Sequence, residues 1–111
     1  MTSKQRSYLK GLAMNIEPIF QIGKGSLTPE ITEAVREAFN TREIIKINVL
    51  KNCFEDINEM ADALSGRTGS QVVQVIGRKI VLYKESKDHK KIYLPGEKRP
   101  TTPQTERRGR S

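Results

Sequence analysis

Apolar residues along the chain follow two different spacings, and each spacing predicts a different kind of element. Between residues 28 and 39 they recur at steps of three and four, which places them on one face of an α-helix. Between residues 43 and 50 apolar and polar residues alternate, as they do in a strand with one covered face. The same patterns predict further helices over residues 3–14 and 52–66, and further strands over residues 19–22, 71–76 and 79–84.

Capping residues and glycines set the predicted ends of these elements. Ser3, Thr28 and Asn52 are expected to cap the three helices, because their side-chain oxygens can accept from free backbone amides. Gly66 is expected to end the third helix in the left-handed conformation. Gly77-Arg78 suits a two-residue hairpin turn with glycine first, and it joins the last two strands.

The order of the elements predicts the fold class. Strands separated by helices are expected to run parallel, and the hairpin adds one antiparallel pair. The nearly continuous apolar residues of the last two strands predict that both are central and covered on both faces. We therefore expect a single small α/β domain over residues 3–95, in the order α-β-α-β-α-β-β, with a four-stranded mixed sheet packed with helices. Residues 96–111 are rich in proline, threonine and charge and are expected to form a flexible basic tail.

The charge of the chain indicates the chemistry of its partner. The 111 residues include 20 Lys and Arg against 13 Asp and Glu, giving a net charge of +7 and a pI near 9.8. Such an excess attracts polyanions, which means nucleic acid or an anionic membrane surface. The chain begins without the apolar stretch of a signal peptide and has no apolar run of membrane-spanning length, so a cytoplasmic protein is expected.

Candidate catalytic and metal-binding groups are scarce in the sequence. Cys53 and His89 are each the single residue of their type, which disfavours a disulfide framework, a zinc site and a Cys-His or Ser-His dyad. The acidic residues of the second and third predicted helices, such as Glu30, Glu33 and Glu59, are expected on solvated helix faces and not in an acid–base pair. We therefore expect a protein that is not an enzyme and needs no metal or cofactor.

The glycine-flanked segment Gly66-Arg67-Thr68-Gly69 is the strongest candidate for binding a ligand. Glycines let a backbone come close enough for its amides to face a ligand, Arg67 can fork onto a phosphate, and Thr68 can donate a hydroxyl. The KH domain uses a GxxG loop in this way on single-stranded nucleic acid. The alternative is that Gly66 only ends a helix.

Three further basic groups are expected to widen the positive surface around this segment. Lys24 lies in the segment GKGS just before a helix, where anions are favoured, although the spacing does not match a nucleotide P-loop. The other two groups are a pair in the hairpin turn and a set on the first helix: Arg78 and Lys79; Lys4, Arg6 and Lys10. Each group taken alone is also consistent with an ordinary solvated surface.

Several segments in this order resemble the CRM domain (chloroplast RNA splicing and ribosome maturation), above all its small bacterial form, the YhbY family. They are LKGLAMNIEPIFQIGKGSLTPEI, REIIKINVL, SGRTGSQVVQVIGRKIVLYK and KKIYLP, and the resemblance runs from about Ser3 to Pro95. The resemblance implies a fold like the C-terminal domain of bacterial translation initiation factor three. It places the family's GxxG loop on Gly66–Gly69 and its early glycine–lysine loop on residues 23–25. Ser26 and Lys84 depart from the pattern, and Lys84 lacks the fork of the family's arginine.

The resemblance also implies a function. It predicts an RNA-binding protein that associates with precursors of the large ribosomal subunit and assists their assembly. The expected partner is ribosomal RNA, with ribosomal proteins as further partners. The alternative is a protein-interaction adaptor on the ribosome, in which the glycines have a purely structural role.

Overall fold

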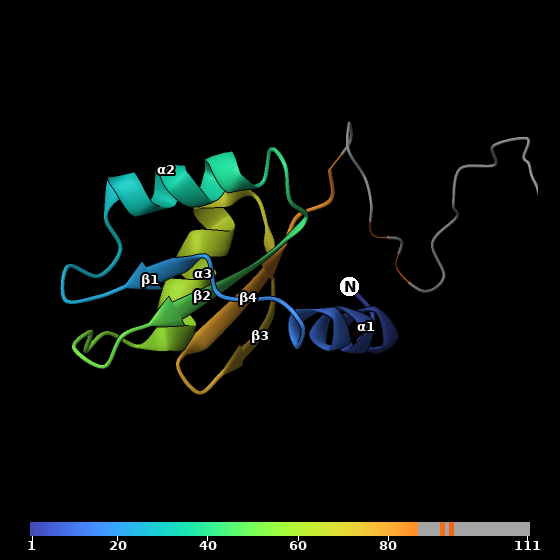
Figure 1. Ribbon diagram of the computed structural model, residues 1–111, viewed down its shortest axis with the longest axis horizontal. Helices are drawn as coiled ribbons and strands as arrows, with labels where there is room; N and C mark the ends of the chain where they lie inside the picture. Colours follow the sequence, from blue (N-terminus) through green and yellow to red (C-terminus); the bar gives the residue numbers. More distant parts are fainter. Residues whose placement is uncertain (87–91, 93, 95–111) are drawn as a thin grey trace, which may run out of the picture.

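The computed structural model describes residues 1–86, 92 and 94, and within them it confirms the predicted order of elements (Figure 1). The helices are α1 (Ser3–Ala13), α2 (Pro29–Ala38) and α3 (Ile57–Thr68). The strands are β1 (Phe20–Ile22), β2 (Ile44–Val49), β3 (Gln71–Ile76) and β4 (Lys79–Tyr83). The predicted tail over residues 96–111 lies outside the described residues.

The strands form one mixed sheet in the order β1-β2-β4-β3. β1 and β2 are parallel and are connected through α2, as predicted, whereas β4 is antiparallel to both β2 and β3. The prediction that β3 and β4 are both central is wrong for β3, which lies at the edge. The burial of the two strands agrees with this order, because residues 80–83 of β4 are all buried, while Gln71 and Ile76 of β3 are exposed.

Helices cover both faces of the sheet. On one face α2 and α3 pack their apolar side chains against the central strands, and Val35, Leu64 and Leu82 are fully buried there. On the other face Leu9 and Ala13 of α1 pack against Val73 and other residues of β3 and β4. Figure 1 shows α1 set apart from α2 and α3, in agreement with these two separate clusters.

The N-terminal caps agree with the prediction in one helix and differ in two. Thr28 caps α2, accepting from the amide of Ile31 at 3.1 Å. Thr2 rather than Ser3 caps α1, in a capping box with Gln5. Asp56 rather than Asn52 caps α3, because the chain first makes a turn in which the amide of Cys53 donates to the carbonyl of Leu50.

The C-terminus of α3 also differs from the prediction. The helix continues through Gly66 and ends at Thr68, and Gly69 adopts the left-handed conformation with φ of 70°. Leu64 and Thr68 are both buried and lie one turn apart, so burial of Thr68 extends the helix beyond Gly66. Within the described part of the chain, none of the helices has the length and apolar character that a membrane span requires.

Candidate nucleic-acid interface

The structure separates the basic groups that the sequence analysis expected to surround Gly66–Gly69. Lys4 and Lys10 are exposed on α1, on the opposite face of the sheet from α3. The hairpin turn with Lys79 lies at the far end of β3, a strand of six residues, or about 20 Å, from the end of α3. The structure therefore does not bring all these groups together around Gly66–Gly69.

Two of the predicted phosphate-binding arginines bind the protein's own backbone. The guanidinium of Arg78 donates to the carbonyl oxygens of Val49 and Cys53 at 3.0 Å and of Leu50 at 2.5 Å. The guanidinium of Arg6 donates to the carbonyl oxygens of Val72 and Val73, both at 2.8 Å. Both side chains were expected to stand free in solvent, and both instead hold segments of the fold together.

Arg6 acts at an irregular point of β3. The register of β3 against β4 shifts between Val72 and Gln74, so that Val73 is an extra residue, a β-bulge. The bulge turns Val73 into the core beneath α1, where its side chain is fully buried. A bulge leaves backbone groups outside the ladder, and the guanidinium of Arg6 satisfies the carbonyls there.

The proposed use of backbone amides in Gly66–Gly69 is also wrong. Residues 66–68 belong to α3, and the amides of Gly69 and Ser70 both donate to the carbonyl of Ser65. Thr68 cannot donate to a ligand as expected, because it is 3% exposed and its hydroxyl bonds the carbonyl of Leu64 at 2.7 Å. The amides and the hydroxyl of the motif are therefore occupied by the helix and its cap.

Arg67 and the two glycines nevertheless lie on the surface at the end of α3. The Arg67 guanidinium makes no hydrogen bond or ion pair with any residue that the structure describes. Gly66 has an ordinary helical conformation, and a Cβ placed on it would meet nothing within 4 Å. The backbone at Gly66 is thus open to close approach from outside, next to an uncommitted cation.

Two further cations, which the sequence analysis missed as site residues, converge on this point. Arg36 of α2 donates from Nη2 to the carbonyl of Arg67 at 2.7 Å, and Lys84 donates from Nζ to the carbonyl of Thr68 at 3.1 Å. Cations are favoured at a helix C-terminus, where carbonyls lack partners. In the sequence Arg36 looks like any charged residue on a polar helix face, so no local signal reveals it. We call this group the α3 end: Arg36, Gly66, Arg67, Gly69 and Lys84.

Lys24 has an indirect relation to the α3 end. The loop that carries it leads to Leu27, which lines the same groove between α2 and α3 as Arg67. Lys24 itself is exposed and is not among the residues that line the groove.

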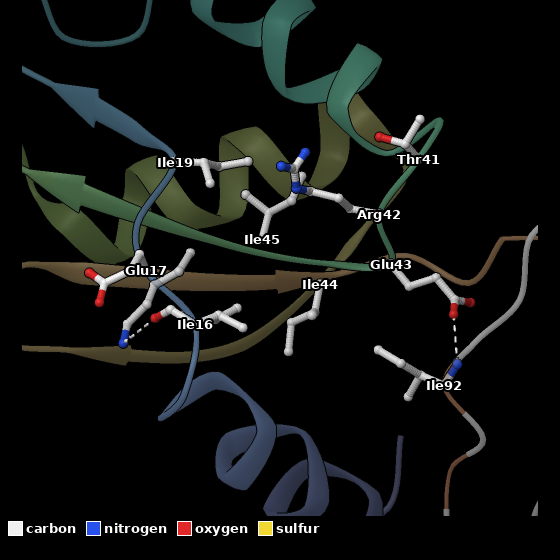
Figure 2. Close-up of a pocket in the computed structure, with 10 residues that line it drawn as sticks. Ile16, Glu17, Ile19, Thr41, Arg42, Glu43, Ile44, Ile45 and Ile92 are labelled. Carbon is white, nitrogen blue, oxygen red and sulfur yellow. Dashed lines mark hydrogen bonds between the residues drawn. The ribbon is translucent and has the colours of Figure 1, made fainter.

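An apolar pocket lies elsewhere and contains none of the predicted site residues (Figure 2). Its volume is about 300 Å³, and isoleucines such as Ile19, Ile44 and Ile92 form much of its wall. Glu43 at its rim is buried and accepts from the amides of Ser86 at 2.9 Å and Ile92 at 2.8 Å. Its carboxylate therefore connects Ser86 and Ile92 to the residue that precedes β2.

No group of three or more His, Cys, Asp or Glu residues in the described part of the chain could hold a metal ion. Cys53 is buried. The geometry at the α3 end offers positive charge and an accessible backbone, which suits binding of a polyanion.

Comparisons with known proteins agree with this chemistry. The model of the CRS1/YhbY (CRM) domain matches residues 1–84. A Bacillus subtilis protein named "Probable RNA-binding protein YqeI" is 48% identical over 95 residues, which cover 86% of this chain and 99% of the relative. A Haemophilus influenzae protein named "RNA-binding protein" is 34% identical, with 86% and 95% covered. The solution structure of the hypothetical protein SAV1595 from Staphylococcus aureus has a TM-score of 0.74 and 49% identity, with 86% and 99% covered.

Proposed function

The chain belongs to the CRS1/YhbY (CRM) domain family, and on this premise we propose that it is an RNA-binding protein that contacts RNA through the α3 end. Relatives from two bacteria carry RNA binding in their names. The net charge of +7 favours association with a polyanion.

One observation carries the choice of the α3 end: the fold requires neither Gly66 nor the guanidinium of Arg67. A glycine inside a helix costs about 1 kcal/mol relative to alanine. No neighbouring atom requires glycine here, because a Cβ on Gly66 would meet nothing within 4 Å. The guanidinium of Arg67 has no hydrogen-bond or ion-pair partner among the described residues. Both features are explained if an RNA strand passes close to the backbone at Gly66 and a phosphate accepts from Arg67.

The proposed contact uses side chains and a bare helix surface, without amide donors. Arg67 supplies the fork for a phosphate, and Arg36 and Lys84 add positive charge at the neighbouring carbonyls of α3. Their bonds to the α3 carbonyls hold these two cations in place before RNA arrives. Preorganised charges lose less side-chain entropy on binding than free ones do.

The finer part of the proposal concerns the RNA. As the resemblance to the family implies, the protein would act in the cytoplasm on precursors of the large ribosomal subunit and assist their assembly. Crosslinking in cells followed by sequencing of the attached RNA tests this step. Concentration of the reads on large-subunit ribosomal RNA is the expected result, and reads spread over all transcripts would contradict it.

The location of the contact is tested with variants that each remove one exposed cation. Arg67→Ala should lower the affinity for a labelled single-stranded RNA by about threefold to tenfold. It should also reduce the slope of log affinity against log salt by about 0.7, the value for one phosphate contact of a single strand. The measurement is fluorescence anisotropy over a series of salt concentrations.

Lys10→Ala is the matched control, because it removes one exposed charge from the other face of the sheet. It should change affinity less than Arg67→Ala does. Equal effects of the two variants would mean that the charge of the whole protein attracts RNA and that the α3 end has no special role. Binding to ribosomal particles that survives nuclease treatment and both substitutions would instead support the protein-interaction adaptor.

A further inference from the structure

A groove between α2 and α3 opens directly beside the α3 end. Its volume is about 540 Å³, which lies within the range of about 300–1,000 Å³ typical of small-ligand sites. Residues from both helices and from the loop before α2 line it: Leu27, Pro29, Thr32, Glu33, Arg36 and Arg67. Arg36 and Arg67 thus belong to both the groove and the α3 end.

The walls of the groove differ in chemistry. Leu27 and Pro29 are apolar, whereas the planar guanidinium of Arg67 is exposed and has no bonding partner among the described residues. Guanidinium planes stack on nucleobases, which are flat, apolar on their faces and polar at their edges. The face of a single base could therefore pack against the apolar residues of the groove and stack on the guanidinium of Arg67.

A buried hydroxyl without a hydrogen-bond partner is an independent observation that points to a ligand in this groove. Thr32 lines the groove and is 7% exposed, and its Oγ1 is the buried side-chain atom without a hydrogen-bond partner in the described structure. Leaving a buried hydroxyl unpaired costs free energy. Threonine in a helix has two accessible side-chain rotamers, so rotation about Cα–Cβ can turn the hydroxyl toward the groove.

A neighbouring hollow limits what part of an RNA can enter. It shares Leu27 and Arg67 with the groove, and its other wall carries the carboxylates of Glu55, Asp56 and Glu59. Glu33 adds a further carboxylate, which pairs with Arg36. These charges repel phosphates but accept hydrogen bonds from base edges, so the backbone is kept at the α3 end.

We propose that this groove receives one unpaired base of the RNA whose backbone crosses the α3 end, and that Thr32 hydrogen-bonds its edge. The inference rests on the proposed function and adds the part of the nucleotide that is recognised. The base must be unpaired, since stacking in a duplex would keep it out of the groove. Thr32 becomes a residue that senses the base, while Arg67 contacts both base and backbone.

The first experiment separates base from backbone. Full-length protein is titrated against fluorescein-labelled decamers of adenylate, cytidylate and uridylate, and against an abasic ribose-phosphate strand of equal length and charge. At least one base-containing decamer should bind about fivefold to a hundredfold tighter than the abasic strand. Equal affinities for all four strands would overturn the base site.

The second experiment tests the hydroxyl of Thr32. Thr32→Val keeps the shape and removes the hydroxyl, and it should weaken binding of the preferred decamer by about threefold to tenfold. Binding of the abasic strand should not change, and Thr32→Ser should retain the wild-type preference. The matched control is Thr41→Val, since Thr41 is exposed and lies outside the groove. Thermal unfolding should show that all the variants fold.

The outcomes distinguish this inference from the proposed function. In one outcome, Arg67→Ala loses affinity for RNA while the wild type binds abasic and base-containing strands equally. This result would support the α3 end as the backbone contact and reject the groove as a base site. A decrease in Thr32→Val that is equal for both kinds of strand overturns the role of Thr32 in sensing a base. Wild-type affinity of Arg67→Ala for every strand overturns both proposals together.

Discussion

The chain contains two Gly-Arg pairs, Gly66-Arg67 and Gly77-Arg78, and the fold treats them in opposite ways. Gly77 has φ of 58° at the hairpin turn, a conformation that strongly favours glycine, while Gly66 lies in a regular helix. The guanidinium of Arg78 donates to three backbone carbonyls, while the guanidinium of Arg67 has no partner among the described residues. The Gly-Arg pair that follows β3 thus has a structural role, whereas the side chains of the pair before β3 have none that the described structure shows.

This difference shows how to separate residues kept for folding from residues available for a ligand. A glycine that relieves backbone strain and an arginine that satisfies carbonyls are explained by the fold itself. The fold does not explain a glycine that lowers helix stability or an arginine whose guanidinium has no partner. The second pair is therefore the better place to look for RNA.

The largest expected effect is on stability, from Arg78→Ala. It leaves the carbonyls of Val49, Leu50 and Cys53 without their donor and should lower the free energy of unfolding by about 2–3 kcal/mol. Urea denaturation measures this loss. Arg67→Ala is the matched control and should change stability by no more than about 0.5 kcal/mol. Equal losses in the two variants would remove the contrast between the arginines.

The next effect is that of Gly77→Ala, again on stability. Alanine at φ of 58° is strained, so the free energy of unfolding should fall by about 1–2 kcal/mol. Because a Cβ at this position meets nothing within 4 Å, the loss would report backbone strain and not a steric clash. An unchanged denaturation midpoint would show that the hairpin turn does not need glycine.

The smallest effect is expected for Arg67→Lys, on RNA affinity. Lysine keeps the charge and loses the planar fork, so affinity should fall by about twofold to threefold while the salt slope stays the same. Anisotropy titrations at several salt concentrations measure both quantities. A flatter slope of log affinity against log salt in this variant would mean that lysine does not replace the charge contact of Arg67. That result would contradict a simple phosphate contact at this position.

Sequence patterns were sufficient for the elements and their order, because those depend on neighbours a few residues apart. The helical face of α2 and its cap at Thr28 are examples. The position of β3 at the sheet edge depends instead on which strand the hairpin inserts beside β2, and the end of α3 depends on burial of Thr68. Neither is encoded in local spacing.

The roles of the cations were even less accessible from sequence. Arg78 and its acceptor Val49 are 29 positions apart, and Arg6 and Val72 are 66 apart. Arg36 reaches the carbonyl of Arg67 over 31 positions. A guanidinium looks the same in the sequence whether it binds a carbonyl or faces solvent, so its role can be assigned only after the chain is folded.

The most direct test of the central claim compares two glycines in helices. Gly66 and Gly11 are both exposed in a helix, and a Cβ on either would meet nothing within 4 Å. Alanine at either position should raise the free energy of unfolding by up to about 1 kcal/mol, since helix propensity improves.

The measurement is the RNA affinity of these two stabilised variants. If an RNA strand approaches the backbone at Gly66, Gly66→Ala lowers affinity by about tenfold or more, a cost of about 1.4 kcal/mol, while Gly11→Ala binds like the wild type. Wild-type affinity in Gly66→Ala would contradict the account, because it would show that RNA does not approach the backbone at Gly66.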